Sequence, residues 1–472
     1  MGNKFSNEDY DLPTQTLIQS MVDAEEKAIA KRKKQAAEDC ECKNGMFPAG
    51  RNDTPTSRRQ FLAGAATGAA TLVTAGAVGA AIPAGAIDYP VQADPTKVQG
   101  RLTNDDGGYG SRSQFESEVR WRFPTATKES SWTMTPLDSS QGMVTPSGLH
   151  FERHHGGIPN INPASHNLIV HGMVNNAKKY SMADLQRFPS VSRFHFIECS
   201  GNGLTEWREP TLKTVQGTHG LTSTSEWTGV PLSTILREVG VEDGAAWILA
   251  EGADAAVMTR SVPLDKAWKD AMLVYAQNGE AIRPEQGYPL RLLLPGFEGN
   301  THIKWLRRLE ISDKPFMTRE ETSKYTDLLD GGKARQFSFT MEAKSVITFP
   351  SGEMKLPGAG FYEITGLAWT GLGNIKRVEV STDGGDNWQL AELGPISPIC
   401  HTRFRFPWHW DGQPTIIQSR CQDETGYVQP TIQQLIDERG LDGGKYGSIY
   451  HLNGIQSWAI AADGGVSNVH KF

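Results

Sequence analysis

One cysteine in this sequence lies where the protein could hold a thiol rigidly and still leave it reachable. Cys199 follows the apolar residues Phe196 and Ile197 and precedes the small, turn-forming residues 200–203. A soft thiolate in such a place is a good ligand for a redox metal. A nucleophile for acyl transfer would also need a histidine base and an oxyanion hole. The residue types alone leave three interpretations open: a metal ligand, a nucleophile and a buried structural cysteine.

Three other segments carry side chains that could bind an anionic organic group. They are residues 151–155, with one arginine and two histidines, residues 251–254, which end in Asp254, and residues 287–305. Arginine, lysine and histidine suit a phosphate, and a carboxylate suits the N–H groups of a heterocycle. These segments therefore change the weight that each of the three interpretations of Cys199 receives.

Simpler interpretations of the same residues stay open. His154 and His155 could be loop histidines or could bind zinc, although no third ligand has helix or strand spacing to them. Arg291 and Lys304 could make ordinary surface ion pairs. Only the wider context of the motifs can decide between these interpretations.

The composition of the chain excludes several other classes of function. Its 472 residues suffice for more than one domain, and a net charge of -7 gives no attraction to nucleic acid or anionic lipid. The five cysteines include no Cys-x-x-Cys pair for zinc or an iron–sulfur cluster, and no Cys-x-x-Cys-His for a c-type haem. No Gly-x-Gly-x-x-Gly follows a strand, which disfavours nicotinamide binding.

The elements that would position these groups form an α+β domain followed by an all-β domain. Up to about Ile311, short strand-like runs alternate with helical candidates such as Leu232–Val239. From Phe337 onward, regularly spaced strands with a hairpin turn at residues 383–387 predict a β-sandwich of immunoglobulin type, in which Cys400 could be bonded to Cys421. The expected strands are residues 168–170, 194–197, 246–249, 290–294, Lys344–Phe349, 361–369, Ile375–Ser381, 388–393, 401–406 and 415–421.

The first 86 residues have the features of an export segment. Residues 57–62, Ser-Arg-Arg-Gln-Phe-Leu, open an uncharged stretch, and residues 84–86 supply a small-residue cleavage site. This pattern resembles a twin-arginine signal, a route that carries folded proteins; an uncleaved membrane anchor is the alternative. Ahead of it, residues 24–34 predict a helix, which we expect to be solvated and discarded with the signal. The chain is therefore expected to divide into residues 1–86, 87–330 and 331–472.

The order and separation of the site segments resemble the molybdopterin-binding motifs of the sulfite oxidase family. There, Cys-x-Gly-Asn carries the metal thiolate, which matches residues 199–202. The resemblance implies that Arg153 faces the substrate oxyanion and that Tyr325 is an active-site tyrosine. The contacts to the molybdenum cofactor that it implies come from Phe151, Arg153, His154, His155, Cys199, Ser200, Gly201, Asn202, Asp254, Gln286, Arg291, His302, Ile303 and Lys304. The late half resembles the family's dimerisation domain.

Two departures from the usual motifs refine this resemblance. Many sulfite oxidases follow Gly-Asn with two arginines, where this chain has Gly203 and Leu204. Gln286 stands where a pterin-binding histidine is usual. With the export signal and the missing haem motif, these features resemble the molybdenum subunit of sulfane dehydrogenases, the SoxC type, of the periplasmic thiosulfate-oxidising system.

Resemblance to this branch implies a periplasmic enzyme that oxidises the persulfide sulfur on a carrier protein to a sulfonate. Electrons would pass to a separate diheme c-type cytochrome of SoxD type, in a homodimer or a heterotetramer with the cytochrome. Free sulfite, again with cytochrome c as acceptor, is the alternative substrate. An exported immunoglobulin-like binding protein without metal is the alternative outside enzymes. Further anion contacts in the family's topology would come from Lys213, Arg403, Arg405 and Arg420.

Overall fold

A computed structural model describes residues 12–44, 116–125, 127–329, 332–439 and 451–471. The chain divides into two compact units, one of residues 1–32 and 118–472 and the other of residues 33–117. The expected signal motif and cleavage site, residues 57–86, lie outside the described residues. Within the described ranges, no helix is both long and apolar enough to cross a membrane.

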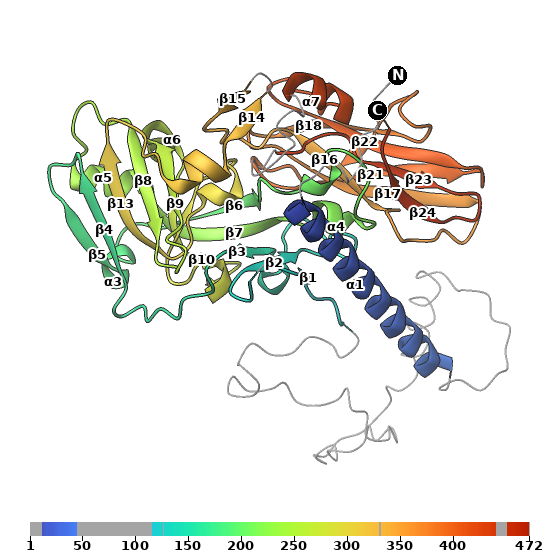
Figure 1. Cartoon of the computed structure of the whole chain (residues 1–472), viewed down its shortest axis with the longest axis horizontal. Helices are drawn as coiled ribbons and strands as arrows, with labels where there is room; N and C mark the ends of the chain where they lie inside the picture. Colours follow the sequence, from blue (N-terminus) through green and yellow to red (C-terminus); the bar gives the residue numbers. More distant parts are fainter. Residues whose placement is uncertain (1–11, 45–115, 126, 330–331, 440–450, 472) are drawn as a thin grey trace, which may run out of the picture. The chain divides into compact units, whose positions relative to one another are not determined.

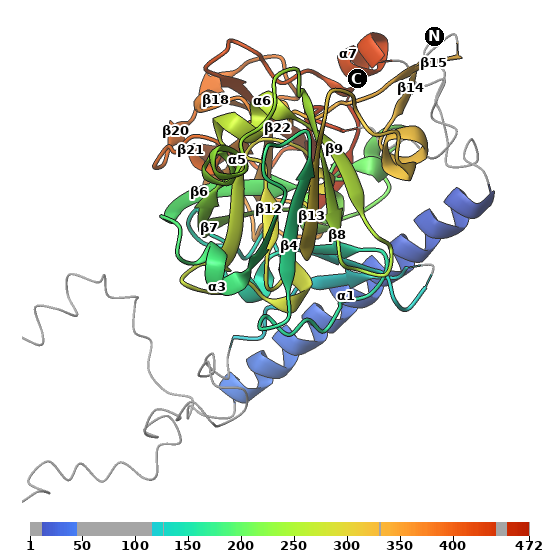
Figure 2. The same cartoon turned by 90° about the vertical axis from the view of Figure 1, so that its left-hand side faces the viewer.

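Two five-stranded sheets share the hydrophobic core of the first domain (Figure 1). Successive side chains of a strand point to opposite faces, so β4 buries Leu168 and Val170 in this core. Figure 2 shows β4, β13 and β8 side by side, with β4 and β13 parallel. One sheet has the order β11-β10-β7-β6, with β12 pairing with β10, and consists of β6 (Val191–Glu198), β7 (Thr222–Pro231), β10 (Met272–Gln277), β11 (Glu280–Ala281) and β12 (Arg291–Leu293). The other has the order β5-β4-β13-β8-β9 and consists of β4 (Asn167–Gly172), β5 (Lys178–Ser181), β8 (Trp247–Gly252), β9 (Thr259–Pro263) and β13 (Leu306–Ser312).

Short helices connect the strands of this domain. The predicted helix Leu232–Val239 is confirmed as α5, which buries Leu232, Ile235, Leu236 and Val239 at helical spacing and ends at Gly240 in the left-handed conformation. The other α-helices are α3 (Met182–Leu185), α4 (Val215–His219) and α6 (Leu264–Lys269). Single turns are η2 (Ser147–Leu149), η3 (Leu204–Glu206), η4 (Pro284–Gln286), η5 (Gly299–Thr301) and the π-helix η6 (Glu320–Lys324).

Two small sheets complete the first domain. One is a three-stranded antiparallel sheet, β1-β2-β3. Its strands are β1 (Trp121–Phe123), β2 (Ser131–Met134) and β3 (Glu152–His154), and a hairpin of β14 (Asp327–Leu329) and β15 (Lys333–Arg335) lies farther along the chain. The described part of the chain is mostly sheet with few helices, so strands outweigh helices more than the α+β prediction implied.

The C-terminal domain consists of two sheets that share a second core. Four aromatic residues alternate along one strand and are all buried in this core: Phe404, Phe406, Trp408 and Trp410. One sheet has the order β16-β17-β21-β20: β16 (Lys344–Phe349), β17 (Gly360–Trp369), β20 (Glu392–Leu393) and β21 (Thr402–Trp410). The other has the order β19-β18-β22-β23-β24: β18 (Ile375–Ser381), β19 (Gln389–Leu390), β22 (Thr415–Asp423), β23 (Ser457–Ile460) and β24 (Val466–Val469). Helix α7 (Ile432–Arg439) precedes β23.

Three details of the sequence-based picture need correction. The strand expected at residues 388–393 is split between β19 and β20, which belong to different sheets. Cys400 and Cys421 are both free, so no disulfide joins them. The N-terminal helix α1 (Leu12–Asn44) is not solvated on all sides, because Met21 and Ile29 are buried in a core that they share with Trp121.

Candidate active site

The residues singled out in the sequence line one cavity. It contains about 670 Å³ of space between atoms, part of which is open to solvent. All predicted site residues line it except Ser200, Gly201 and Asn202, which follow Cys199 in the sequence. The lining residues are Phe151, Arg153, His154, His155, Cys199, Asp254, Met258, Gln286, Arg291, Gly299, Asn300, His302, Ile303, Lys304, Trp305 and Tyr325.

Cys199 lies directly after β6 and is a free, partly exposed thiol. Its backbone is fixed on both sides, since its N–H donates to Leu221 O at 2.9 Å and its carbonyl accepts from Asn202 N–H at 2.9 Å. Gly203 has a φ of 88°, a left-handed conformation that glycine adopts without strain. Burial raises the pKa of the Cys199 thiol, while the Gly201 amide and the charge of Arg153 act in the opposite direction.

A buried ion pair lies directly behind this cysteine. The Glu198 carboxylate and the Lys344 ammonium are 3.1 Å apart, and both side chains are 0% exposed. Trp369 Nε1 donates to the other carboxylate oxygen at 2.6 Å, and Asn202 Nδ2 donates to the first at 2.8 Å. Lys344 and Trp369 belong to the C-terminal domain, so that domain helps to fix the loop that carries the thiol.

Two cations on the cavity wall, Arg291, which is buried, and Lys304, which is partly buried, form no ion pair among the described residues. Arg291 donates to Gln286 O at 3.1 Å and to Gln286 Oε1 at 3.2 Å, and its Nε is buried without a hydrogen bond among the described residues. Lys304 Nζ donates to the carbonyls of Arg153 and Glu285, at 3.0 and 2.9 Å. Burial lowers the pKa of Arg291 to about 9 and that of Lys304 to about 7. Unpaired buried cations are costly, so this wall fits an anionic group such as a phosphate.

Two imidazoles of the cavity, those of His155 and His302, have lowered pKa values. Burial lowers the pKa of His155 to about 3, with further repulsion from Arg153, and burial lowers the pKa of His302 well below its usual value. His302 Nε2 lies 3.1 Å from Phe297 O, and the opposite nitrogen, Nδ1, accepts from Leu294 N–H at 3.4 Å. His154 Nδ1 lies 3.1 Å from a carboxylate oxygen of Glu152. Neutral imidazoles can donate or accept a hydrogen bond with a cofactor without adding charge.

Arg153 and Tyr325 border the cavity near the thiol. Arg153, on β3, donates to Ser131 O at 3.3 Å and to His154 O at 2.8 Å, and its guanidinium lies 5.6 Å from the centre of the Trp132 ring. No ion pair of Arg153 is present among the described residues, so its charge is available to an anion. Burial raises the pKa of Tyr325 far above neutrality, so this phenol is protonated.

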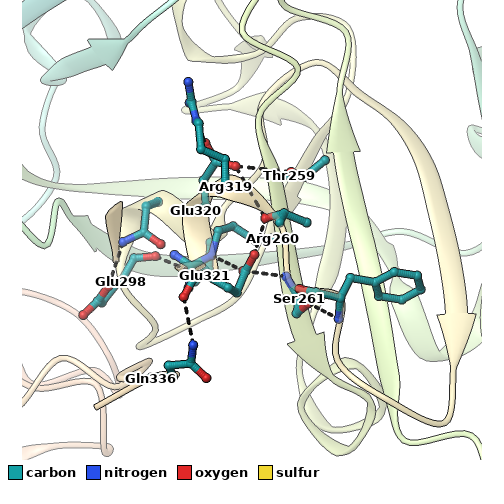
Figure 3. Close-up of polar contacts among 12 residues, drawn as sticks. Thr259, Arg260, Ser261, Glu298, Arg319, Glu320, Glu321 and Gln336 are labelled. Carbon is teal, nitrogen blue, oxygen red and sulfur yellow. Dashed lines mark hydrogen bonds and ion pairs between the residues drawn. The ribbon is translucent and has the colours of Figure 1, made fainter. Parts of the chain in front are cut away.

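A network of buried polar contacts holds the segment that carries Tyr325 (Figure 3). Arg260 Nε donates to Glu321 Oε1 at 2.7 Å, and both side chains are 1% exposed. The same oxygen accepts from Ser261 N–H at 2.9 Å. The Arg260 guanidinium lies 4.9 Å from the centre of the Tyr325 ring, so the ion pair fixes the π-helix η6 and supports the tyrosine that follows it.

Sequence reasoning missed four residues of the cavity: Met258, Gly299, Asn300 and Trp305. The last three lie within the basic segment that was recognised, and their position beside His302 and Lys304 was the available signal. Gly299 is required here because a Cβ would lie 2.7 Å from Glu198 O. Met258 carries no signal in the sequence, since an apolar residue next to a strand usually packs in a core.

The additional anion contacts expected from the family's topology lie outside the cavity. Lys213 pairs with Glu26, Arg405 with Glu392 and Arg420 with Glu379, and Arg403 donates to the carbonyls of Ser140 and Gly142.

The described part of the chain offers no group of three or more His, Cys, Asp or Glu side chains that could hold a metal ion by themselves. Among the described residues, His154 and His155 therefore belong to no group of ligands that could form the zinc site considered above. The cavity fits a metal for which the protein contributes one thiolate and an organic cofactor contributes the other ligands.

Comparisons with known proteins agree with this geometry. Residues 155–320 match the model of the oxidoreductase molybdopterin binding domain, and residues 335–446 match the Mo-co oxidoreductase dimerisation domain. The crystal structure of the sulfane dehydrogenase SoxCD from Paracoccus pantotrophus is similar, with 41% identity, a TM-score of 0.71 and coverage of 84% of this chain and 96% of that chain.

Nitrate reductases are also similar to this chain. NADH nitrate reductase 1 of Arabidopsis thaliana is 32% identical over 53% of this chain, and the NADH nitrate reductase of Ulva prolifera is 30% identical over 62% of it. The chain spans 31% and 38% of the lengths of these two relatives. The molybdopterin binding domain and these relatives support the molybdenum cofactor as the cofactor of this chain. The two domain matches and the likeness to the solved sulfane dehydrogenase show that the chain belongs to the sulfite oxidase family of molybdenum-cofactor oxidoreductases.

Proposed function

We propose that this chain is the molybdenum subunit of a SoxC-type sulfane dehydrogenase. It oxidises the persulfide sulfur on a carrier protein to a sulfonate and passes the electrons to a diheme c-type cytochrome of SoxD type. The observation that carries the proposal is the 41% identity to the solved sulfane dehydrogenase over 96% of that chain. Each oxygen added to the sulfur comes from water and releases two protons and two electrons, so a separate electron acceptor is required.

Different residues of the cavity would bind the cofactor and the substrate. The Cys199 thiolate would hold the metal, and Arg291, Lys304 and the neutral His302 would hold the pterin and its phosphate. When bound, the molybdenum cofactor supplies the two-electron oxidation and the oxygen transfer. The charge of Arg153 attracts the anionic sulfur group and lowers the cost of bringing it to the site. The protonated Tyr325 can donate a hydrogen bond to the same group.

Steady-state assays with two substrates test the proposal. Persulfide-loaded carrier protein and free sulfite are offered to the purified, cofactor-loaded enzyme, with reduction of a c-type cytochrome as the readout. We expect turnover with the persulfide and little with sulfite. The reverse preference would make the chain a sulfite:cytochrome c oxidoreductase. Turnover with neither substrate, in a protein without molybdenum, would favour an exported binding protein.

We further propose that the protein is exported folded to the periplasm and assembles through its C-terminal domain. The twin-arginine pattern at residues 57–62 supports export. The match of residues 335–446 to a dimerisation domain supports a homodimer or a heterotetramer with the cytochrome. The strand orders β16-β17-β21-β20 and β19-β18-β22-β23-β24 support an immunoglobulin-type sandwich.

Replacing Arg153 tests its assignment to the substrate. Arg153→Gln removes the charge but keeps a hydrogen-bonding side chain, and we expect the KM for the anionic substrate to rise by about tenfold or more, with a smaller change in kcat. Arg403→Gln is the matched control, because Arg403 also donates to two backbone carbonyls but lies outside the cavity. An unchanged KM in Arg153→Gln would remove this arginine from the substrate site.

The low pKa of Lys304 predicts a pH-dependent uptake of the cofactor. Burial lowers this pKa to about 7, so the side chain of the cofactor-free protein is charged below that pH and neutral above it. We expect the rate of cofactor uptake to fall as the pH rises through 7. Lys304→Arg should abolish this dependence, because a guanidinium stays charged. A wild-type rate that does not change with pH would contradict the assignment of Lys304 to an anionic group.

A further inference from the structure

The N-terminal helix binds the folded body along one face. Met21, Glu25 and Ile29 are four residues apart and are all buried, whereas Lys27 and Lys31 on the other faces are exposed. Such spacing places the three buried side chains on one stripe of the helix. Helix α1 therefore has a built contact face of the kind that a docked amphipathic helix uses.

The centre of this face is a buried carboxylate. Glu25 is 1% exposed, and it accepts from the backbone N–H of Thr214 at 2.8 Å, from the Thr214 hydroxyl at 2.6 Å and from Lys213 N–H at 2.5 Å. Burial raises the pKa of Glu25, and these three donors act against that rise. A buried carboxylate is costly unless several donors satisfy it, so the contact is specific to this arrangement.

The body provides a fitting space for this carboxylate. A Cβ on Gly217 would lie 2.1 Å from Glu25 Oε1, so the position accepts Glu25 only because it carries no side chain. Gly217 lies within α4, where alanine would otherwise be a better helix former. The start of α1 lies close to α4 in Figure 1.

Arg32 makes a second set of contacts with the body, at the C-terminal end of this contact face. Arg32 Nη1 donates to Asp138 at 2.8 Å, and Nη2 donates to Glu118 at 2.9 Å. Its guanidinium also lies 5.0 Å from the centre of the Trp121 ring. The contacts of α1 thus extend from Met21 to Arg32.

The segment that receives Glu25 is also in contact with the C-terminal domain. Residues 212–214 lie between Cys199 and Leu221, which are joined by the backbone hydrogen bond described above. Asn468, from the last strand of the C-terminal domain, donates to Leu212 O at 2.6 Å and to Glu206 at 2.7 Å. The segment that receives Glu25 is therefore held by both the cysteine region and the C-terminal domain.

We propose that residues 12–32 form a docking helix that recognises the folded body in cis, through Glu25 at Lys213–Thr214 and Arg32 at Asp138, and that it binds only after both domains have come together. Residues 12–32, which lie ahead of the twin-arginine motif, are then bound by a surface that forms only when both domains have folded. This proposal does not depend on the substrate.

Hydrogen–deuterium exchange on the full-length chain tests it. Glu25→Ala removes the carboxylate from the helix, and Gly217→Ala fills its space from the body. We expect each variant to raise exchange at both residues 21–32 and residues 212–218 by about tenfold, a hydrogen-bond-sized effect. Lys27→Gln, on the exposed side, is the matched control and should leave both segments unchanged. Exchange in β6 and β7 shows whether a variant still folds.

Two results would overturn the proposal. The first is exchange at residues 212–218 that neither variant changes, although β6 and β7 stay protected. The second comes from pulsed labelling during refolding of the wild-type chain. We expect residues 21–32 to become protected from exchange after β6, β22 and β24. Protection of residues 21–32 before these strands would show that the helix binds without the completed fold.

Discussion

Cys199→Ser is expected to abolish turnover while the protein keeps its fold. Cys199 is the single cysteine that lines the cavity among the described residues, and an alcohol is a hard, weakly acidic group that does not replace a soft thiolate. Serine is nearly isosteric, so the backbone bonds to Leu221 and Asn202 should remain. We expect a loss of at least about 1,000-fold in kcat, a scale typical of removing a central catalytic group.

The control for this variant is Cys400→Ser. Cys400 is also a free cysteine, but its thiol donates to Phe194 O at 2.9 Å outside the cavity, and a hydroxyl can do the same. Molybdenum content, circular dichroism and steady-state kinetics are measured for both variants. Near-normal turnover in Cys199→Ser, or an equal loss in Cys400→Ser, would remove Cys199 from its role as the metal ligand.

Local patterns were sufficient to predict many of the elements. The helix Leu232–Val239 and the strands Lys344–Phe349 and Ile375–Ser381 have the predicted bounds, because a sharp apolar period and flanking turn residues define them. The prediction of one continuous strand at residues 388–393 was wrong because the two halves of this segment pair with different sheets. No local signal in the sequence marks the point where the chain passes from one sheet to the other.

The cavity lining was predictable for a different reason. Most of its polar members belong to short segments in which several unusual residues lie together, such as residues 151–155 and 302–304. The sequence does not predict the contacts that hold these lining residues in place. Glu198 and Lys344 are 146 positions apart, and Arg260 and Glu321 are 61 apart, so only the folded chain shows that they meet.

Lys344→Met should be the most damaging substitution outside the cavity. It removes the only cation beside Glu198 within the described residues and leaves a buried, uncompensated carboxylate next to the metal ligand. Breaking a buried ion pair in this way costs about 3–5 kcal/mol of unfolding free energy. The matched control is Lys355→Met, because the pair of Lys355 and Asp463 is largely exposed and contributes at most about 1 kcal/mol. Urea unfolding of the purified variants measures both effects.

A double variant separates stability from the positioning of Cys199. Glu198→Gln with Lys344→Met removes both charges, so most of the unfolding free energy should return. The amide introduced by Glu198→Gln can still accept from Trp369, but it offers an N–H₂ group where Asn202 now donates, so the loop that carries Cys199 shifts. We therefore expect a stable protein whose Mo(V) paramagnetic resonance signal differs from that of the wild type. An unchanged signal in a fully stable double variant would mean that the ion pair only stabilises the fold, and that the C-terminal domain does not set the geometry of the thiolate.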